Sequence, residues 1–241
     1  MLSSAELFTG DALVFMTSLL GGKVTWKQMA RNWTVSWVGN FVGALVWAVF
    51  IGYLSESLED AGAAEFAIAV ARKKAYQTWF SIFLKSIGAN IMVCDAIWQA
   101  TSSEEAVGKI LALRFPVTGF VFLGLDHCIA NQFLIPVGML LMRKAETESL
   151  GDEISVYRIL FQALLPATLG NLIGGSSFVG TTYWYAFDSM QSLNEIRERI
   201  RRSWSSSRNI AQTSHAAPEE IPPHSMDVAV DTGDYDVKVG E

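Results

Sequence analysis

A long apolar run with two ionisable side chains near its centre is the feature of this sequence that most constrains its fold. The run extends from Gly119 to Pro136 and reads G-F-V-F-L-G-L-D-H-C-I-A-N-Q-F-L-I-P, with Asp126 and His127 in the middle. His127 is the only histidine in the apolar part of the chain, because the other two lie in a polar tail. Ionisable residues within a membrane-length segment are costly and usually mark a functional site. The Asp-His pair is therefore the first candidate for a site.

The composition is that of a membrane protein rather than an ordinary soluble domain. Hydrophobic residues make up 51% of the chain and charged residues only 17%, whereas about a quarter of the residues of a soluble domain are charged. Much of the net charge of −6 lies in the segment after Trp204, so it carries no information about a ligand. The two cysteines, Cys94 and Cys128, lie in apolar runs and are expected to act as small packing residues. We expect no metal and no cofactor.

Apolar runs predict several membrane-spanning helices. A bilayer core of about 30 Å needs roughly 20 apolar residues in one helix. Runs of sufficient length are Asn32–Leu54, Ala75–Ala100 and Ile159–Phe187. The span 75–100 carries Lys85 and Asp95, which are ten positions apart and do not share a helix face. We expect their partners on another protomer or in a segment that precedes the chain.

Two further segments are predicted to be broken helices. The run Asp11–Leu20 is too short to span a bilayer and follows the sequence E-L-F-T-G, which is interpreted as a non-helical join. The run Phe115–Met142 is longer than one span needs, is bracketed by Pro116 and Pro136, and has a polar centre. Irregular backbone at membrane depth is tolerated only where it is buried in protein or lines a cavity. Both breaks are therefore expected to lie inside the bundle.

The sequence divides into three parts. Residues 1–187 form the predicted membrane domain, 188–204 an amphipathic helix at the cytoplasmic membrane surface, and 205–241 a disordered acidic tail. The distribution of lysine and arginine places the loop around Lys23 and the C terminus on the cytoplasmic side. We expect a multi-pass protein of the plasma membrane with a cytoplasmic C terminus.

Four motifs, which occur in order between Leu7 and Trp184, resemble the formate/nitrite transporter family. They are E-L-F-T-G with W-K-Q-M-A-R-N-W, then G-A-N-I-M-V-C-D-A-I-W, then G-L-D-H-C-I-A-N-Q-F-L-I-P, and G-N-L-I-G-G-S-S-F-V-G-T-T-Y-W. The resemblance implies an all-α, aquaporin-like bundle with broken second and fifth segments, one pore per protomer and a homopentameric assembly. The matching motifs begin within the second segment, so we expect an N-terminally truncated member that lacks the first segment and half of the second.

The resemblance also implies roles for individual residues. Asp126 stands where the family usually has glutamate, beside the central histidine. The positions that match the substrate pathway are His127, Thr9, Lys74, Asn90, Asn131 and Asn171. The positions that match the two constrictions are Leu7, Phe8 and Phe120. The three asparagines could satisfy the broken backbone as well as contact a solute.

These roles predict transport of a small monovalent anion such as formate, nitrite or lactate, coupled to a proton. A bare anion crosses an apolar constriction only at high cost, so a basic vestibule at Lys74 would attract it and protonation would neutralise it. His127 would donate the proton or hydrogen-bond to the passing species. The expected partners are the anion, a proton, the lipid bilayer and four further copies of the chain, with no role for nucleic acid.

Other interpretations remain open at the level of the sequence. The chain could be a non-conducting protomer that assembles with full-length subunits, or its Asp-His pair could be a purely structural network. A channel for water or glycerol is suggested by analogy of fold alone. A membrane enzyme is disfavoured because the chain has neither an H-E-x-x-H motif nor a G-x-S-x-G motif.

Overall fold

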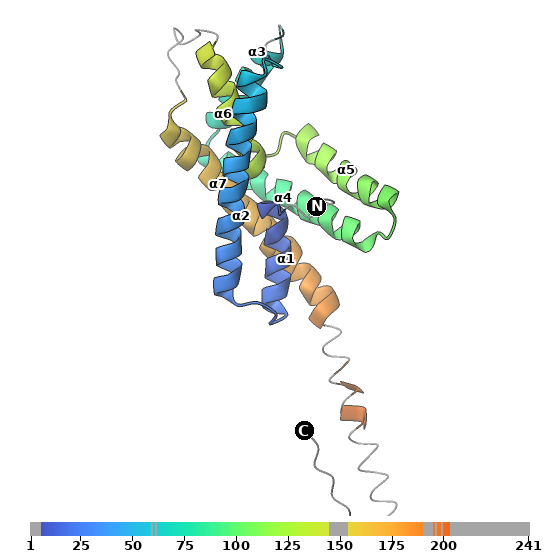
Figure 1. Cartoon of the computed structure of the whole chain (residues 1–241). Coiled ribbons are helices and arrows are strands. Elements are labelled where there is room, and N and C mark those ends of the chain that lie inside the picture. Colours follow the sequence, from blue (N-terminus) through green and yellow to red (C-terminus); the bar gives the residue numbers. More distant parts are fainter. Residues whose placement is uncertain are drawn as a thin grey trace, which may run out of the picture. The chain divides into compact units, whose positions relative to one another are not determined.

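The computed structural model describes residues 6–58, 60, 62–144, 154–189, 195, 197, 198 and 200–202. Within these residues all regular structure is helical, as the sequence predicts (Figure 1). The α-helical elements are α1 (Phe8–Leu20), α2 (Trp26–Trp47), α3 (Ala63–Ala75), α4 (Trp79–Ser102), α5 (Ala106–Phe122), α6 (Cys128–Lys144), α7 (Leu165–Leu172) and α8 (Thr181–Tyr183). Wider, π-helical turns continue or join them as η1 (Ala48–Leu54), η3 (Arg158–Leu164), η4 (Ile173–Gly180) and η5 (Trp184–Ser189).

Among the residues that the structure describes, three continuous helices are long and apolar enough to cross a membrane. They are Trp26–Leu54, Trp79–Ser102 and Arg158–Phe187, which confirms the three predicted unbroken spans. Helix α1 is apolar but has only 13 residues, about 20 Å at 1.5 Å per residue. It therefore has the length of a half-helix, as predicted. The prediction that all of E-L-F-T-G is a non-helical join was wrong, because the helix begins at Phe8 and only Glu6 and Leu7 of this motif are non-helical.

The break predicted in the run 115–142 lies between α5 and α6. Helix α5 ends at Phe122 and α6 begins at Cys128. Gly124 in this join has a φ of 65°, a left-handed conformation that glycine adopts without steric cost. Pro116 and Pro136 lie inside α5 and α6, so the chain breaks between the prolines rather than at either of them.

Helix α3 corrects the prediction for the segment before α4. The sequence predicts a span that begins at Ala75, but residues Ala63–Ala75 form a separate helix that packs on α6. The span itself begins at Trp79, because Thr78 is extended and its hydroxyl caps the helix by accepting a hydrogen bond from the Ser81 amide. Lys74 consequently lies in the last turn of α3 rather than at the start of a span.

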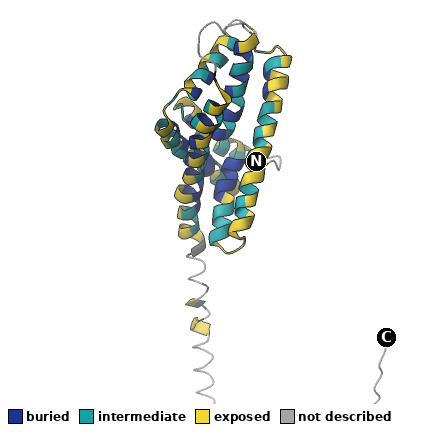
Figure 2. Ribbon diagram, turned by 90° about the vertical axis from the view of Figure 1, so that its left-hand side faces the viewer, coloured by how far each residue is buried: buried dark blue, intermediate teal, exposed yellow. Residues whose placement is uncertain are grey.

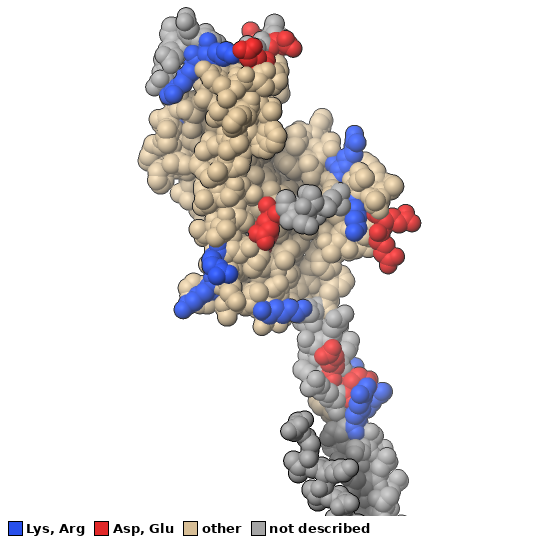
Figure 3. Space-filling model, viewed as in Figure 1, with Lys and Arg blue, Asp and Glu red and all other residues tan. Residues whose placement is uncertain are grey.

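Helix α4 packs against α5, α7 and η4. Many of the residues that line these contacts are buried, while the outward faces of α2 and α5 expose large apolar side chains (Figure 2). On the face shown in Figure 3, the charged side chains form separate groups, and the surface between them is largely uncharged. Such a surface suits a bilayer. The predicted helix 188–204 falls largely, and the tail 205–241 wholly, outside the described residues.

Candidate functional site

The N-terminal ends of α1 and α6 meet inside the bundle, and Thr9 and His127 form the contact. The Thr9 hydroxyl oxygen lies 3.1 Å from Nε2 of His127, although the two residues are 118 positions apart. Thr9 is fully buried and His127 is 7% exposed. The structure thus brings together the two broken segments that the sequence predicts, through two of the residues predicted to line the substrate pathway.

The hydrogen bonds of His127 assign the position of its proton. The residue precedes the first turn of α6, and its Nδ1 lies 3.3 Å from the amide nitrogen of Ala130. An amide N–H can only donate, so Nδ1 accepts and the neutral ring carries its hydrogen on Nε2. That hydrogen points to the Thr9 oxygen, which leaves the threonine hydroxyl hydrogen available for another acceptor.

Phe120 covers the histidine on one side. The two rings are stacked, with centroids 5.6 Å apart and an angle of 19° between their planes, and Phe120 is 8% exposed. The other two predicted constriction residues differ from it in environment. Phe8 is buried in the main apolar cluster, and Leu7 is half-buried at the start of α1.

Asp126 is fully buried and has polar partners on both carboxylate oxygens. Its Oδ1 accepts hydrogen bonds from Nζ of Lys74 at 2.8 Å and from the side-chain Nδ2 of Asn131 at 3.2 Å. Its Oδ2 accepts from the Gln77 amide at 3.2 Å. A buried carboxylate is tolerated when it is paired and hydrogen-bonded in this way. Gln77 was not anticipated from the sequence, because nothing in its local pattern indicates a buried partner.

Asn171 holds the break in place through the backbone. Its Oδ1 accepts from the Cys128 amide at 2.8 Å, and its Nδ2 donates to the carbonyl oxygens of Asp126 and Ser86 at 3.3 and 2.7 Å. Asn90 donates to the carbonyl oxygens of Thr9 and Asn171 at 3.1 and 2.6 Å. The Asp126 carbonyl and the Cys128 amide flank the break, so Asn171 satisfies backbone groups that the broken helix leaves without helical partners.

Asn40 of α2 bridges the backbone groups at the other break, and the sequence analysis did not predict this role. Its Oδ1 accepts from the Phe8 amide at 3.0 Å, and its Nδ2 donates to the Glu6 carbonyl at 3.2 Å. A signal for it was present: G-N-F-V-G-A begins at Gly39 and G-N-L-I-G-G at Gly170. The two segments are similar and bring their asparagines to equivalent places.

Lys85 and Asp95 find partners within the chain, contrary to expectation. Lys85 donates to the Gln77 side-chain oxygen. Asp95 accepts from the Tyr183 hydroxyl at 3.0 Å and from the Gln99 amide at 2.6 Å. The described residues contain no cluster of histidine, cysteine and carboxylate side chains that could hold a metal ion.

A helical membrane bundle in which two half-helices aim their N-terminal ends at one buried polar site has the architecture of a channel or transporter. The formate/nitrite transporter family model matches residues 1–185. The chain is therefore a membrane protein of the formate/nitrite transporter family.

Individual relatives agree with this assignment. The chain is 33% identical over 200 residues to the probable formate transporter of Methanothermobacter thermautotrophicus. This alignment covers 77% of the chain and 69% of the relative. It is 35% identical over 191 residues to the formate channel FocA of Haemophilus influenzae, with 75% and 67% covered. Formate-nitrite transporter 3 of Toxoplasma gondii is 34% identical over 185 residues, and the chain spans 35% of its length.

Solved structures show the same fold. A pentameric formate channel with formate bound superimposes with a TM-score of 0.65 at 30% identity, covering 77% of this chain and 76% of the other. An ion channel of the same family gives a TM-score of 0.69 at 28% identity, covering 77% and 71%.

Proposed function

We propose that this chain transports small monovalent anions, with formate and nitrite as the leading substrates and lactate as a further one. The observation that carries the proposal is the buried contact of Thr9 and His127 at the meeting of two half-helices, beside a paired Asp126 and under the Phe120 ring. Helix N-terminal ends favour negative charge. The relatives named as formate channels and transporters support the substrate class.

In the proposed path, Lys74 attracts the anion at the vestibule and Phe120 with Leu7 and Phe8 forms the apolar constrictions. Between them, the neutral His127 and the Thr9 hydroxyl offer hydrogen bonds to the solute. A second proton on the ring would need Nδ1, where the Ala130 N–H already lies. Proton coupling through His127 therefore requires the first turn of α6 to release that hydrogen bond.

We further propose a homopentameric assembly in the plasma membrane. The solved pentameric formate channel supports a homopentamer for this chain, with one pore in each protomer. In the predicted orientation, the loop at Lys23 and the C terminus lie in the cytoplasm. The vestibule at Lys74 would then lie on the outer side of the plasma membrane.

Flux measurements test the proposal directly. The purified 241-residue chain is reconstituted into liposomes with an internal pH dye, and uptake of labelled formate is measured under an inward proton gradient. We expect formate uptake with internal acidification, and loss of most of the acidification in His127→Phe. Cys128→Ala, a change at the adjacent buried residue, is the control for folding and should transport normally.

Two results would contradict the proposal. Equal proton-coupled flux in His127→Phe and the unaltered chain would remove the proton role of the histidine. Correctly assembled pentamers without any anion flux would favour the non-conducting protomer instead. Cross-linking in the liposomes separates that outcome from a failure to assemble.

A further inference from the structure

Lys85 occupies an unusual electrostatic position on α4. Its ammonium donates to Oε1 of Gln77, and Nε2 of the same amide donates to Oδ2 of Asp126 at 3.2 Å. Lys74 binds the other carboxylate oxygen at 2.8 Å. One glutamine side chain therefore links the second lysine to the pair of Lys74 and Asp126.

This network contains two ammonium groups and one carboxylate. Asp126 is fully buried, and both its oxygens are occupied by partners. Among the residues that the structure describes, Lys85 has no carboxylate within ion-pair distance. The cluster thus carries one positive charge that only a neutral amide contacts. A half-buried cation without a counter-ion attracts an anion more strongly than a solvated one.

Lys85 also lies on the face of α4 that turns toward the constriction. Gly88 and Met92 follow it at helical spacing on that face. A Cβ at Gly88 would lie 3.5 Å from the Leu125 side chain, and Met92 packs in the cluster that contains Phe120. Along α4, Lys85 is therefore placed between the Gln77 end of the network and the residues that pack on Phe120.

We propose that Lys85 is a second anion-binding group, which receives one small carboxylate-type anion from the vestibule before it passes Phe120. An ammonium has three N–H donors and Gln77 accepts one of them, so two remain for the oxygens of formate or nitrite. Gln77 holds the lysine in place without neutralising it. The inference deepens, and rests on, the proposed anion transport.

The test compares Lys85→Gln, Lys85→Arg and the control Lys73→Gln in the liposome assay. Lys73 is exposed and lies in the same turn of α3 as Lys74, so its change removes an equal charge at the same end of the molecule. We expect Lys85→Gln to raise the KM for formate about fivefold to tenfold with little change in kcat. Lys85→Arg should restore most of the affinity, and Lys73→Gln should stay within about twofold of the unaltered chain.

A direct binding measurement keeps this inference separate from the transport proposal. Broadening of the [13C]formate NMR signal by the purified protein should weaken in Lys85→Gln and not in Lys73→Gln, whether or not the chain conducts. If the unaltered chain binds formate but gives no flux, the proposed transport fails and the binding site stands. If Lys85→Gln binds formate and shows a KM like the unaltered chain, the assignment of Lys85 is overturned.

Discussion

At both helix breaks an asparagine from a neighbouring helix bridges the backbone groups that flank the junction. Asn40 joins the Glu6 carbonyl to the Phe8 amide, and Asn171 joins the Asp126 carbonyl to the Cys128 amide. The bridged groups are two residues apart in each case. The two junctions therefore have the same backbone arrangement, and the residues at equivalent positions can be compared directly.

The side chains at these equivalent positions differ in chemistry. His127 corresponds to Leu7, and the buried, paired Asp126 corresponds to the exposed Glu6, which accepts a 3.3 Å hydrogen bond from Asn32. The comparison teaches that the asparagine bridge builds the break, whereas only at the junction of Asp126 and His127 are the ionisable side chains between the bridged backbone groups buried. The first junction contributes Thr9 and an apolar surface.

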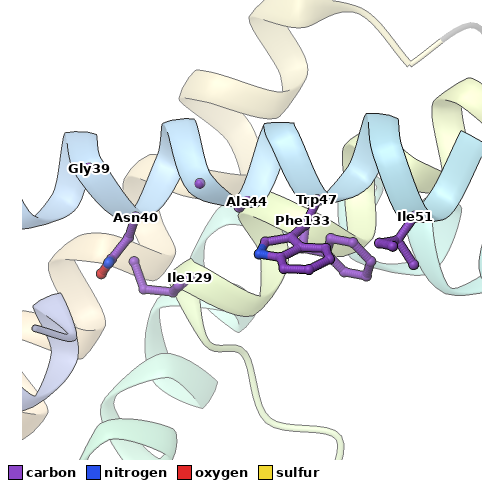
Figure 4. A pocket seen from close by; sticks show the side chains of 8 residues that line it. Gly39, Asn40, Ala44, Trp47, Ile51, Ile129 and Phe133 are labelled. Carbon is purple, nitrogen blue, oxygen red and sulfur yellow. The ribbon is translucent and has the colours of Figure 1, made fainter. Parts of the chain in front are cut away.

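Packing around the two asparagines differs as well. A Cβ on Gly170 or Gly174 would lie 2.3 Å from a backbone oxygen of α4, so that helix packs directly on the glycine face of the last segment. The equivalent Gly39 and Gly43 have nothing within 4 Å. They line a groove of about 480 Å³ with Asn40, Ala44, Trp47, Ile51, Ile129 and Phe133 (Figure 4).

The largest expected difference between the junctions concerns their acidic residues. Asp126→Leu leaves the Lys74 ammonium, which is 15% exposed, without its counter-ion, and should lower the free energy of unfolding by about 3 kcal/mol. Glu6→Leu should change it by less than about 0.5 kcal/mol, because Glu6 is exposed. Denaturant unfolding in detergent micelles measures both.

A double variant separates charge from shape in this comparison. Asp126→Leu combined with Lys74→Met removes both charges and should recover more than half of the lost stability. If Asp126→Leu and Glu6→Leu unfold at the same denaturant concentration, the acidic residues of the two junctions are equivalent and the contrast drawn between them fails.

The asparagines provide the next contrast. Asn171 is fully buried and makes three hydrogen bonds to backbone groups, so Asn171→Ala should cost about 3 kcal/mol. Asn40 is half-buried and bridges the Glu6 carbonyl and the Phe8 amide, so Asn40→Ala should cost about 1 kcal/mol. The same unfolding assay distinguishes the values, and an equal cost at both sites would show that burial does not set the strength of the bridge.

The sequence was sufficient to predict the half of this architecture that depends on local pattern. Charge-free length predicts the spans, and the Asp126-His127 pair in an over-long run predicts the break that begins after Phe122. Helix α3 was missed because its alanine-rich, charged sequence has no membrane-like length. The partners of Lys85 and Asp95 were misplaced because Gln77 and Tyr183 reach them through the fold, and no sequence spacing encodes that approach. Asn40 was recognisable only by comparison with the motif around Asn171.

The smallest expected effects come from the glycines that follow the two asparagines. Replacing them by alanine should change the stability of the protein in opposite directions in the two segments. Gly174→Ala places a Cβ 2.3 Å from the Ile87 carbonyl oxygen, so α4 and η4 must separate, at a cost of about 2 kcal/mol. Gly43→Ala meets open space, and the higher helix propensity of alanine should stabilise α2 by about 0.5 kcal/mol. Thermal unfolding in micelles should therefore move down for the first variant and slightly up for the second. A clear loss of stability in Gly43→Ala would show that the groove in Figure 4 is occupied in the assembled protein, since only an occupant could meet the added methyl group.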